Sequence, residues 1–278
     1  MNEQEFLKKY DASKCPKPSV TADISIFSIF DEGRKNYRKL PDKKLKVLLV
    51  KRGRPPFEGM YALPGGFLRE HETLEQTAYR ELLEETGVEC NFLEQLKTYS
   101  SIGRDPRGWI ITCAFMALID GASIQVYGGD DATSAEWFQI SFRETGCSEN
   151  GIVWKLVLEK DNIRLTALVQ QADDAKYQAE CPHFTVLEQN GLAFDHALLL
   201  ADAICSLRRL IGRTNISFEL LPPMFTLSDL QQVYETVLDR KLLTPSFRRK
   251  IAELVEETDQ FQETAGHRPS KLFMARCR

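Results

Sequence analysis

The sequence predicts an α/β protein: a layered domain of strands and helices, followed by a small domain with the element order of a winged helix. Up to Gly212, strand-like apolar segments are interrupted by two helix-like segments, a pattern typical of a layered α/β domain. After Gly212 the order becomes helix, turn, helix, hairpin. A chain of 278 residues with 43% hydrophobic side chains is long and apolar enough to build both parts around packed cores.

The strands of the first part are predicted from short segments rich in β-branched and aromatic residues. We assign residues 1–19 to an N-terminal extension, 20–212 to the first domain and 213–278 to the second. Residues 52–66 are rich in Gly and Pro, so we expect a loop there. The expected strands are 20–30, 45–52, 109–119 and 135–140, with a hairpin over 152–170 that turns at Asp161-Asn162.

Two helices are predicted in the first domain. In the segment Thr73 to Thr86, the apolar residues Leu74, Ala78 and Leu82 recur on one side, as the helical period requires. Gly87 follows directly, where a helix commonly ends in the left-handed conformation. A second amphipathic helix is expected over residues 194–212.

The second domain shows two helix start signals. Thr226, followed three residues later by Asp229, is typical of a capping box. Thr244 is expected to cap the next helix, with Pro245 in its first position. In the helix that starts at Thr244, the side chains of Phe247, Ile251 and Leu254 are expected to face inward. The tail is predicted to form two strands around Gly266, which completes the order helix, turn, helix, hairpin.

Composition excludes several classes of protein. The sequence has no apolar run of 18 residues, so we expect no membrane span, and its first residues lack an apolar signal core. The seven cysteines form no Cys-x-x-Cys pair and the four histidines are dispersed. This disfavours a zinc site and a disulfide framework and favours a reducing, cytoplasmic location. The net charge of −4 points to no particular partner.

An acidic cluster on the first helix predicts a metal site. Glu81, Glu84 and Glu85 are spaced i, i+3 and i+4, so their carboxylates share one helical face. Neighbouring carboxylates repel one another unless a cation lies among them, and hard oxygen ligands suit Mg²⁺ or Mn²⁺. Because Mg²⁺ usually shares a substrate phosphate, the cluster predicts a ligand that carries phosphate.

Residues around the cluster are expected to support it. Arg80 can orient one carboxylate, and Glu72, near the helix start, can hold Arg80. Gly65 and Gly66 let the preceding loop approach metal and phosphate closely, because neither carries a Cβ atom. Glu70 and Glu75 are interpreted as ordinary solvated side chains.

The whole segment resembles the signature of the Nudix, or MutT-like, hydrolases. Nine positions of that signature match without a gap: Gly66, Glu72, Arg80, Glu81, Leu82, Glu84, Glu85, Gly87 and Val88. The resemblance implies an α/β/α sandwich with a mixed sheet. It further implies an enzyme that cleaves nucleoside diphosphates linked to another group. It also implies that Glu81, Glu84 and Glu85 bind the metal together with Gly66, that Arg80 and Glu72 brace the site, and that a metal-activated water attacks a phosphorus atom.

The resemblance extends over nearly the whole chain. The segment 128–138 is similar to ADP-ribose-type Nudix proteins, and the segments 192–204 and 218–254 resemble the Nudix-related transcriptional regulators of NAD metabolism. In that group a winged helix follows the Nudix domain. The implied partners are a nucleotide-type small molecule and a double-stranded DNA operator, and a two-fold operator would suggest a homodimer.

Within this resemblance, Arg104 and Arg107 are candidates to bind phosphate or ribose with Gly65, because guanidinium groups match phosphate oxygens. The alternative is a turn in which they form salt bridges with Asp105. Trp109 and Trp137 fit core packing better than base stacking. The general base is open, with Asp130, Asp131 and Glu136 as candidates.

The second domain is nearly neutral, with ten basic and nine acidic residues from Arg213 on, so it lacks a strong electrostatic footprint for DNA. Its basic residues are placed as in a DNA-binding winged helix. The DNA-binding candidates are Arg248, Arg249 and Lys250 on the second helix, and Arg268 and Lys271 on the wing.

Three functions remain open from the sequence. The first, favoured because every metal position is intact, is a Mg²⁺-dependent hydrolase of ADP-ribose or a related nucleoside diphosphate derivative that also regulates transcription. The second is a repressor that senses ADP-ribose or a phosphosugar without cleaving it. The third is a plain Nudix enzyme whose second domain serves dimerisation.

Overall fold

A computed structural model gives the fold of the chain, and it describes residues 2–33, 41–87, 90, 92–120, 132–172, 183–262 and 269–276. Among these residues a single sheet of ten strands dominates the first domain. The strands are β1 (Ser19–Asp31), β2 (Lys43–Arg52), β3 (Tyr61–Ala62), β4 (Gly65–Phe67), β5 (Phe92–Tyr99), β6 (Ile110–Leu118), β7 (Ala132–Ser148), β8 (Gly151–Lys160), β9 (Ile163–Ala172) and β10 (Phe184–Asn190).

The sheet is mixed, as predicted. Its main order is β10-β9-β8-β7-β2-β1-β6-β5, while β3 pairs with β2 and β4 pairs with β1. The pair β1–β6 is parallel, and the described neighbours β1–β2, β2–β7, β7–β8, β8–β9, β9–β10, β5–β6, β1–β4 and β2–β3 are antiparallel. The predicted hairpin over 152–170 is present as β8 and β9.

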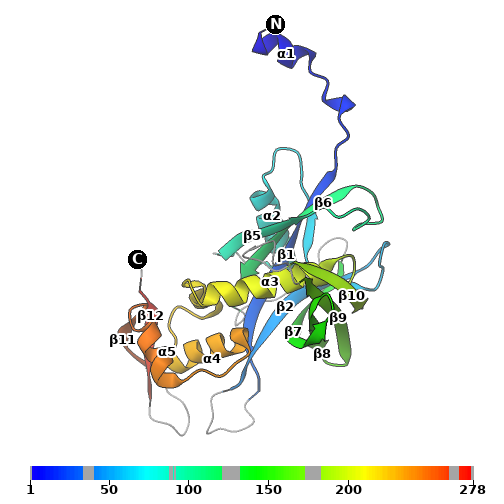
Figure 1. The fold of residues 1–278 in the computed structure, drawn as a ribbon. Coiled ribbons are helices and arrows are strands. Elements are labelled where there is room, and N and C mark those ends of the chain that lie inside the picture. Colours follow the sequence, from blue (N-terminus) through cyan, green and yellow to red (C-terminus); the bar gives the residue numbers. More distant parts are fainter. Residues whose placement is uncertain are drawn as a thin grey trace.

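Helices cover both faces of the sheet, which confirms the α/β/α sandwich. Because side chains alternate along a strand, β1 sends Ile24 and Ile26 to the face covered by α2 (Leu74–Thr86), where they pack with Leu82. It sends Phe27 and Ile29 to the opposite core. That core is shared with α3 (His196–Ile211), which lies across the sheet in Figure 1.

The second domain has the predicted helix, turn, helix, hairpin order. Its parts are α4 (Leu227–Leu238), α5 (Thr244–Ile251), β11 (Val255–Gln262) and β12 (Ser270–Ala275). Thr226 and Asp229 form the predicted capping box at the start of α4. The buried side of α4 and α5 joins the core that contains α3, with a short turn η3 (Ile216–Leu220) between. The winged helix therefore packs directly against the first domain.

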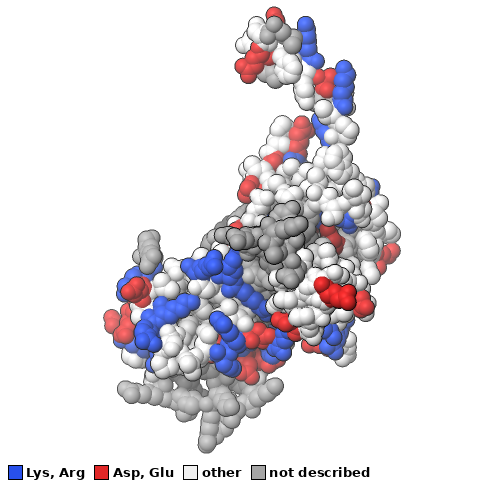
Figure 2. Space-filling model, viewed as in Figure 1, with Lys and Arg blue, Asp and Glu red and all other residues white. Residues whose placement is uncertain are grey.

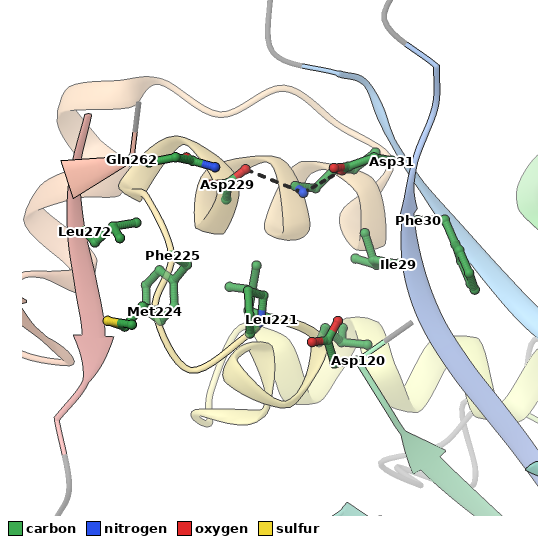
Figure 3. A pocket seen from close by; sticks show the side chains of 13 residues that line it. Ile29, Phe30, Asp31, Asp120, Leu221, Met224, Phe225, Asp229, Gln262 and Leu272 are labelled. Atoms are coloured by element: carbon green, nitrogen blue, oxygen red, sulfur yellow. Dashed lines mark hydrogen bonds and ion pairs between the residues drawn. The ribbon is translucent and has the colours of Figure 1, made fainter. Parts of the chain in front are cut away.

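A pocket of about 280 Å³ lies in the seam between the two domains. At its polar centre Lys43, at the start of β2, reaches Asp31 at the end of β1 and Asp229 on α4. Figure 3 labels the two aspartates and marks both interactions with dashed lines. The Lys43 Nζ atom lies 2.8 Å from Asp31 and 3.5 Å from Asp229, and its side chain is only 11% exposed. The Thr236 hydroxyl of α4 makes a second contact, a hydrogen bond that it donates to the Lys43 carbonyl of β2. One residue of β2 thus ties both domains together.

The N-terminal residues stand apart from the sheet. The short helix α1 (Glu3–Lys9) and the turn η1 (Ala12–Lys14) precede β1 at the top of Figure 1, away from the rest of the chain. Within the described residues, no helix has both the length and the apolar character needed to cross a bilayer.

Several local predictions were wrong. The loop expected over 52–66 contains β3 and the start of β4. These segments are extended because β3 pairs with β2 and β4 pairs with β1. The strand β7 is far longer than the six residues expected. Sequence patterns missed the edge strands β5 and β10, which are mostly partly buried or exposed and therefore less apolar. Leu243, not Thr244, occupies the N-cap position of α5, and Leu254 lies beyond its end, half-buried.

Candidate functional site

The cavity beside α2 brings together most of the predicted site residues of the first domain. It has a volume of about 600 Å³ and is lined by residues of β1, β2, β3, β4, α2, the 104–107 turn and the start of α3. The predicted residues Gly65, Gly66, Glu81, Glu84, Glu85, Arg104 and Arg107 all line it.

The glycine pair allows β4 to press against acidic side chains. A Cβ atom added to Gly66 would lie 1.9 Å from Glu81 Oε1, and one added to Gly65 would lie 2.8 Å from Asp23 Oδ1. Neither position has room for a side chain. The two glycines therefore permit close approach, of Gly65 to the Ala22 carbonyl and Asp23 and of Gly66 to the Glu81 carboxylate. Their predicted approach to metal and phosphate stays a prediction.

Local sequence signals fix α2 in place. Thr73 and Gln76 form a capping box at its start, and Gly87 ends it in the left-handed conformation. Ala78 and Leu82 are buried against the sheet. This orientation turns Glu81, Glu84 and Glu85 toward the cavity.

Arg80 lies at the centre of an ion-pair network on α2. Its Nε atom lies 2.9 Å from Glu72 Oε1, and its Nη1 atom lies 2.5 Å from Glu81 Oε1 and 3.4 Å from Glu84 Oε2. Hydrogen bonds from Arg80 lower the pKa of Glu72 to about 2. The hydrogen bond to Glu72 in turn raises the pKa of Arg80. Burial raises the pKa of Glu81 despite the opposing effect of Arg80. The geometry matches the expected links from Glu72 to Arg80 and from Arg80 to a carboxylate.

The donor set fits a hard divalent cation by its chemistry, because three carboxylates line one cavity beside the glycine pair. As placed, however, no group of three His, Cys, Asp or Glu side chains within the described residues is arranged to hold a metal. Arg80 instead neutralises Glu81 and Glu84, and Arg69 lies 3.8 Å from Glu84. The metal-binding roles of Glu81, Glu84, Glu85 and Gly66 therefore stay predictions.

The two predicted arginines make different contacts. Arg107 pairs with Asp105, its Nη2 atom 2.7 Å from Oδ2, which is the salt-bridged turn foreseen as the alternative. Arg104 does not join that turn. Its guanidinium group binds Asp195 through two hydrogen bonds of 2.9 and 2.7 Å, and its side chain is 4% exposed. Both arginines still line the cavity, so their roles toward a ligand stay predictions.

Aromatic rings form the exposed mouth of the cavity. The Arg107 guanidinium carbon lies 5.3 Å from the ring centres of both Phe67 and Phe194, and that of Arg52 lies 4.9 Å from Phe194. Phe67 is 44% exposed. Such a row of rings and guanidinium groups offers flat surfaces to a planar ligand group.

Two further residues of the cavity lining, Asp23 and His196, are largely buried and were not predicted from the sequence. His196 Nδ1 accepts a hydrogen bond of 2.8 Å from the Leu63 amide, and His196 Nε2 lies 4.0 Å from Asp23 Oδ2. Burial lowers the pKa of His196 to about 4 and raises that of Asp23. The one signal in the sequence is the adjacent pair Asp195 and His196 at the start of α3, which fits a helix start equally well.

Other expectations have mixed outcomes. Trp109 is 58% exposed, so its predicted core packing is wrong, whereas Trp137 packs against the core on the α2 face. Glu136 does not line the cavity and is bound by Lys160 and Ser134. Asp130 and Asp131 lie outside the described residues, so the general base stays open.

The DNA-binding candidates lie on the surface of the winged helix. Arg248, Arg249 and Lys250 on α5 are exposed, and Figure 2 shows Lys and Arg side chains gathered over this part of the molecule, at lower left, with acidic side chains beside them. Lys250 also donates to the Gly212 carbonyl, and Lys271 is paired with Glu257. Arg268 lies outside the described residues. The DNA-binding roles of all five stay predictions.

Fold and cavity together define a Nudix-type domain joined to a winged helix, and comparison with known proteins supports this class. Residues 26–142 match the NUDIX domain family, and residues 217–275 match the family described as NrtR DNA-binding winged helix domain. The "ADPR responsive transcriptional repressor NtrR" of Acinetobacter baylyi is 33% identical over 98% of this chain and 88% of its own length. The chain therefore belongs to the NrtR family of Nudix and winged-helix proteins.

Two further similarities concern the fold and the first domain. The crystal structure of Shewanella oneidensis NrtR has a TM-score of 0.60 and 28% identity, with 92% of this chain and 94% of that chain covered. The structure of that NrtR with a 27mer DNA has a TM-score of 0.59, with 92% and 93% covered. The ADP-ribose pyrophosphatase of Methanocaldococcus jannaschii is 43% identical, over 36% of this chain and 58% of its own length.

The contact between β4 and Glu81 generates a first prediction. Gly66→Ala should push the Glu81 carboxylate out of place, because the new Cβ atom would overlap it. If Glu81 binds metal, Mn²⁺ affinity should fall by about 10- to 100-fold, as measured by electron paramagnetic resonance. Gly146→Ala is the matched control, since nothing lies within 4 Å of its added Cβ atom. Equal Mn²⁺ affinity in the two variants would contradict the role of Glu81.

The buried histidine generates a second prediction. The pKa of His196 is lowered from 6.5 to about 4 by burial, an effect reinforced by Arg104 and Arg52 and opposed by Asp195. The unfolded chain therefore binds more protons between pH 6.5 and 4, so His196 should cost about 3 kcal/mol of folding stability as the pH falls through that window.

The measurement is urea unfolding at pH 7.5, 6 and 5. In His196→Asn, whose amide oxygen can still accept from the Leu63 amide, the loss between pH 7.5 and 5 should be clearly smaller than in the wild type. Identical losses in both proteins would show that His196 is not buried in its neutral form.

Proposed function

We propose that this protein binds ADP-ribose or a related nucleoside diphosphate derivative in the cavity of its first domain and regulates transcription through its winged helix. The observation that carries the proposal is one cavity that combines the Glu81, Glu84 and Glu85 carboxylates with arginines and an aromatic mouth. It lies in a chain that also has a winged helix and is 33% identical, over nearly its full length, to a repressor named as responsive to ADPR.

The chemistry of the cavity suits a diphosphate. With Mg²⁺ or Mn²⁺ bound at the α2 carboxylates, the metal would neutralise diphosphate charge and activate a water molecule. Arg80, fixed by Glu72, holds Glu81 and Glu84 in place, and Arg107 presents a half-exposed guanidinium group at the mouth. The intact acidic pattern favours hydrolysis of the diphosphate, and the first domain is similar to an ADP-ribose pyrophosphatase.

A second candidate is sensing without hydrolysis. The repressor relative spans the whole architecture, whereas the pyrophosphatase relative matches only 36% of the chain. The seam between domains also favours a signalling role, because β1 carries Asp23 at the cavity and Asp31 at the seam. A ligand that shifts β1 would therefore act on the Lys43 bridge to α4.

The DNA interface is proposed on α5 and the wing. Arg248 and Arg249 are exposed on α5, the helix that would enter a major groove. We propose that two copies of the chain bind one two-fold operator. DNA binding by the winged helix should weaken steeply as the salt concentration rises. A housekeeping enzyme whose second domain serves only dimerisation would show no such salt-dependent DNA binding.

Hydrolysis is tested by the α2 carboxylates. Purified protein with Mg²⁺ and a panel of nucleotide conjugates, with products identified by mass spectrometry, should release AMP from ADP-ribose. Glu85→Gln and Glu84→Gln should each reduce turnover by at least about 100-fold, because each removes a charged ligand. Glu70→Gln, on the exposed turn before α2, is the control and should retain full turnover.

Two results separate the candidate functions. Wild-type turnover that survives both cavity substitutions would show that the carboxylates are not the site. Binding of ADP-ribose by the wild type without any product would exclude the hydrolase and leave the sensor.

Regulation is tested by a gel-shift titration of operator DNA with and without ADP-ribose. We expect ADP-ribose to change the DNA affinity of the wild type by about 5- to 150-fold. Lys43→Met, which removes the bridge between Asp31 and Asp229, should still bind DNA but respond several-fold less to ADP-ribose. Lys44→Met is the matched control, because Lys44 only approaches Glu32 at 3.9 Å. An equal response in both variants would show that the signal does not pass through Lys43.

A further inference from the structure

Residues 2–17 form an arm that leaves the first domain at the start of β1. Figures 1 and 2 show this arm, with α1 and the turn η1, standing clear of the rest of the molecule. Each of these residues whose exposure is described is exposed. Among the described residues, the hydrogen bonds, ring contact and ion pair of the arm join arm residues to one another.

The sequence nevertheless encodes a helix in this arm. Asn2 and Glu5 exchange two hydrogen bonds of 3.2 and 2.8 Å between side chain and backbone, as in a capping box. Lys8 and Lys9 in the last turn suit the negative end of the helix dipole. However, α1 has only seven residues, and isolated helices shorter than about 12 residues are marginal in water. The helix therefore needs a surface to pack on.

The arm has an aromatic side with which to make that contact. Phe6 and Tyr10 are four residues apart, a spacing that places both on one side of a helix, and their ring centres lie 5.8 Å apart. They are 49% and 55% exposed. Aromatic side chains are enriched where proteins bind one another, so the surface that α1 needs is an apolar one.

Exposed apolar side chains surround the root of the arm. The start of β1 lies between β4 and β6, and the Ser19 amide donates to the Trp109 carbonyl just before β6. Phe67 on β4 is 44% exposed, Trp109 is 58% exposed, and Ile102, in the connection that leads to β6, is fully exposed. We call these three residues the root patch. Exposed apolar groups gathered at one place mark a contact surface.

The link between arm and sheet directs α1 away from the root patch of its own chain. Pro16 and Pro18 lie within three residues of each other, and each proline restricts its own backbone and favours an extended residue before it. Figure 1 shows this link leading outward from β1. A return to the same root patch would require a reversal of the chain, whereas a neighbouring molecule can be reached without one.

We propose that the arm of one copy of the chain packs on the root patch of a second copy, and that the exchange is reciprocal. Because arm and patch share one end of the domain, a two-fold axis there brings each arm to the partner's patch. Each contact would include five exposed large apolar side chains. If each buries about 100 Å², the two contacts together bury about 1,000 Å², the lower end for a specific interface.

This proposal goes beyond the two-copy operator complex proposed above, because it names the surfaces that join the copies. It does not depend on the ligand of the cavity. Phe67 belongs to the root patch and also lines the cavity, so the partner's arm would lie beside the cavity mouth.

Sedimentation analysis of the full chain over a range of concentrations tests the proposal. The arm variant is Phe6→Ser with Tyr10→Ser, and the patch variant is Ile102→Ser with Trp109→Ser. The control is Phe261→Ser, since Phe261 is 57% exposed on the wing. The wild type and the control should form equally stable dimers, and the arm and patch variants should each dimerise at least about 10-fold more weakly.

Mixing the arm variant with the patch variant adds a sharper test. A mixed dimer has one intact contact, from the unchanged arm of the patch variant to the unchanged patch of the arm variant. The mixture should therefore contain more dimer than either variant alone at the same total concentration. A mixture without this gain, or arm and patch variants that dimerise as tightly as the wild type, would overturn the proposal.

Hydrogen exchange of the α1 amides shows whether the arm packs on a partner or on its own chain. These amides should be protected in the concentrated wild type and unprotected in the patch variant, although its arm is unchanged. The protection should disappear on dilution below the dissociation constant of the dimer. Protection that is independent of concentration would place the arm on its own chain, and no protection at all would leave it without a partner. Either result overturns the proposal, even if a variant fails to fold.

Two further results would separate this proposal from the proposed function. A monomeric wild type that still binds ADP-ribose would refute the arm exchange and leave the proposed function in place. An arm variant that dimerises normally but binds operator DNA more weakly would show that the arm contacts DNA, which also refutes the exchange.

Discussion

The close approach of the β4 backbone to the acidic face of α2 is the constraint on which the candidate site depends. Gly66 leaves no space between its own backbone and the Glu81 carboxylate, and burial there raises the pKa of that carboxyl group. Charge of this kind is stable only if compensated. In the structure Arg80 provides the compensation, and Glu72, just before the start of the helix, holds Arg80 in place. A cation bound at the carboxylates would share or replace that role.

The strand β1 connects this site to the winged helix. It lines the cavity with Thr21 and Asp23 near its start, and the seam with Ile29, Phe30 and Asp31 at its end. The core of α3 is continuous with that of α4 and α5, so the domains share apolar contacts as well as the Lys43 bridge. Coupling between cavity and DNA-binding surface therefore has a physical route through packed elements.

The sequence predicted those features of the fold and site that depend on residues close together in the chain. The α2 helix and its Gly87 terminus were predicted because local spacing and capping residues fix a helix, and the link between Glu72 and Arg80 was predicted because Glu72 lies just before the helix start. Asp23 and His196 could not be predicted, since β1 and the start of α3 are far apart in sequence and meet only through the sheet. The predicted salt bridge from Arg104 to Asp105 was wrong for the same reason. Asp105 is adjacent to Arg104 in sequence, whereas its actual partner, Asp195, is 91 residues away.

The most direct test of the account is a crystal structure of the full chain with Mn²⁺ and a non-hydrolysed ADP-ribose analogue, using anomalous scattering to locate the metal. The account predicts a manganese peak at the Glu81, Glu84 and Glu85 carboxylates, beside Gly66 and the diphosphate, with Arg80 still bound to Glu72. Manganese found elsewhere, or a diphosphate bound away from α2, would contradict it.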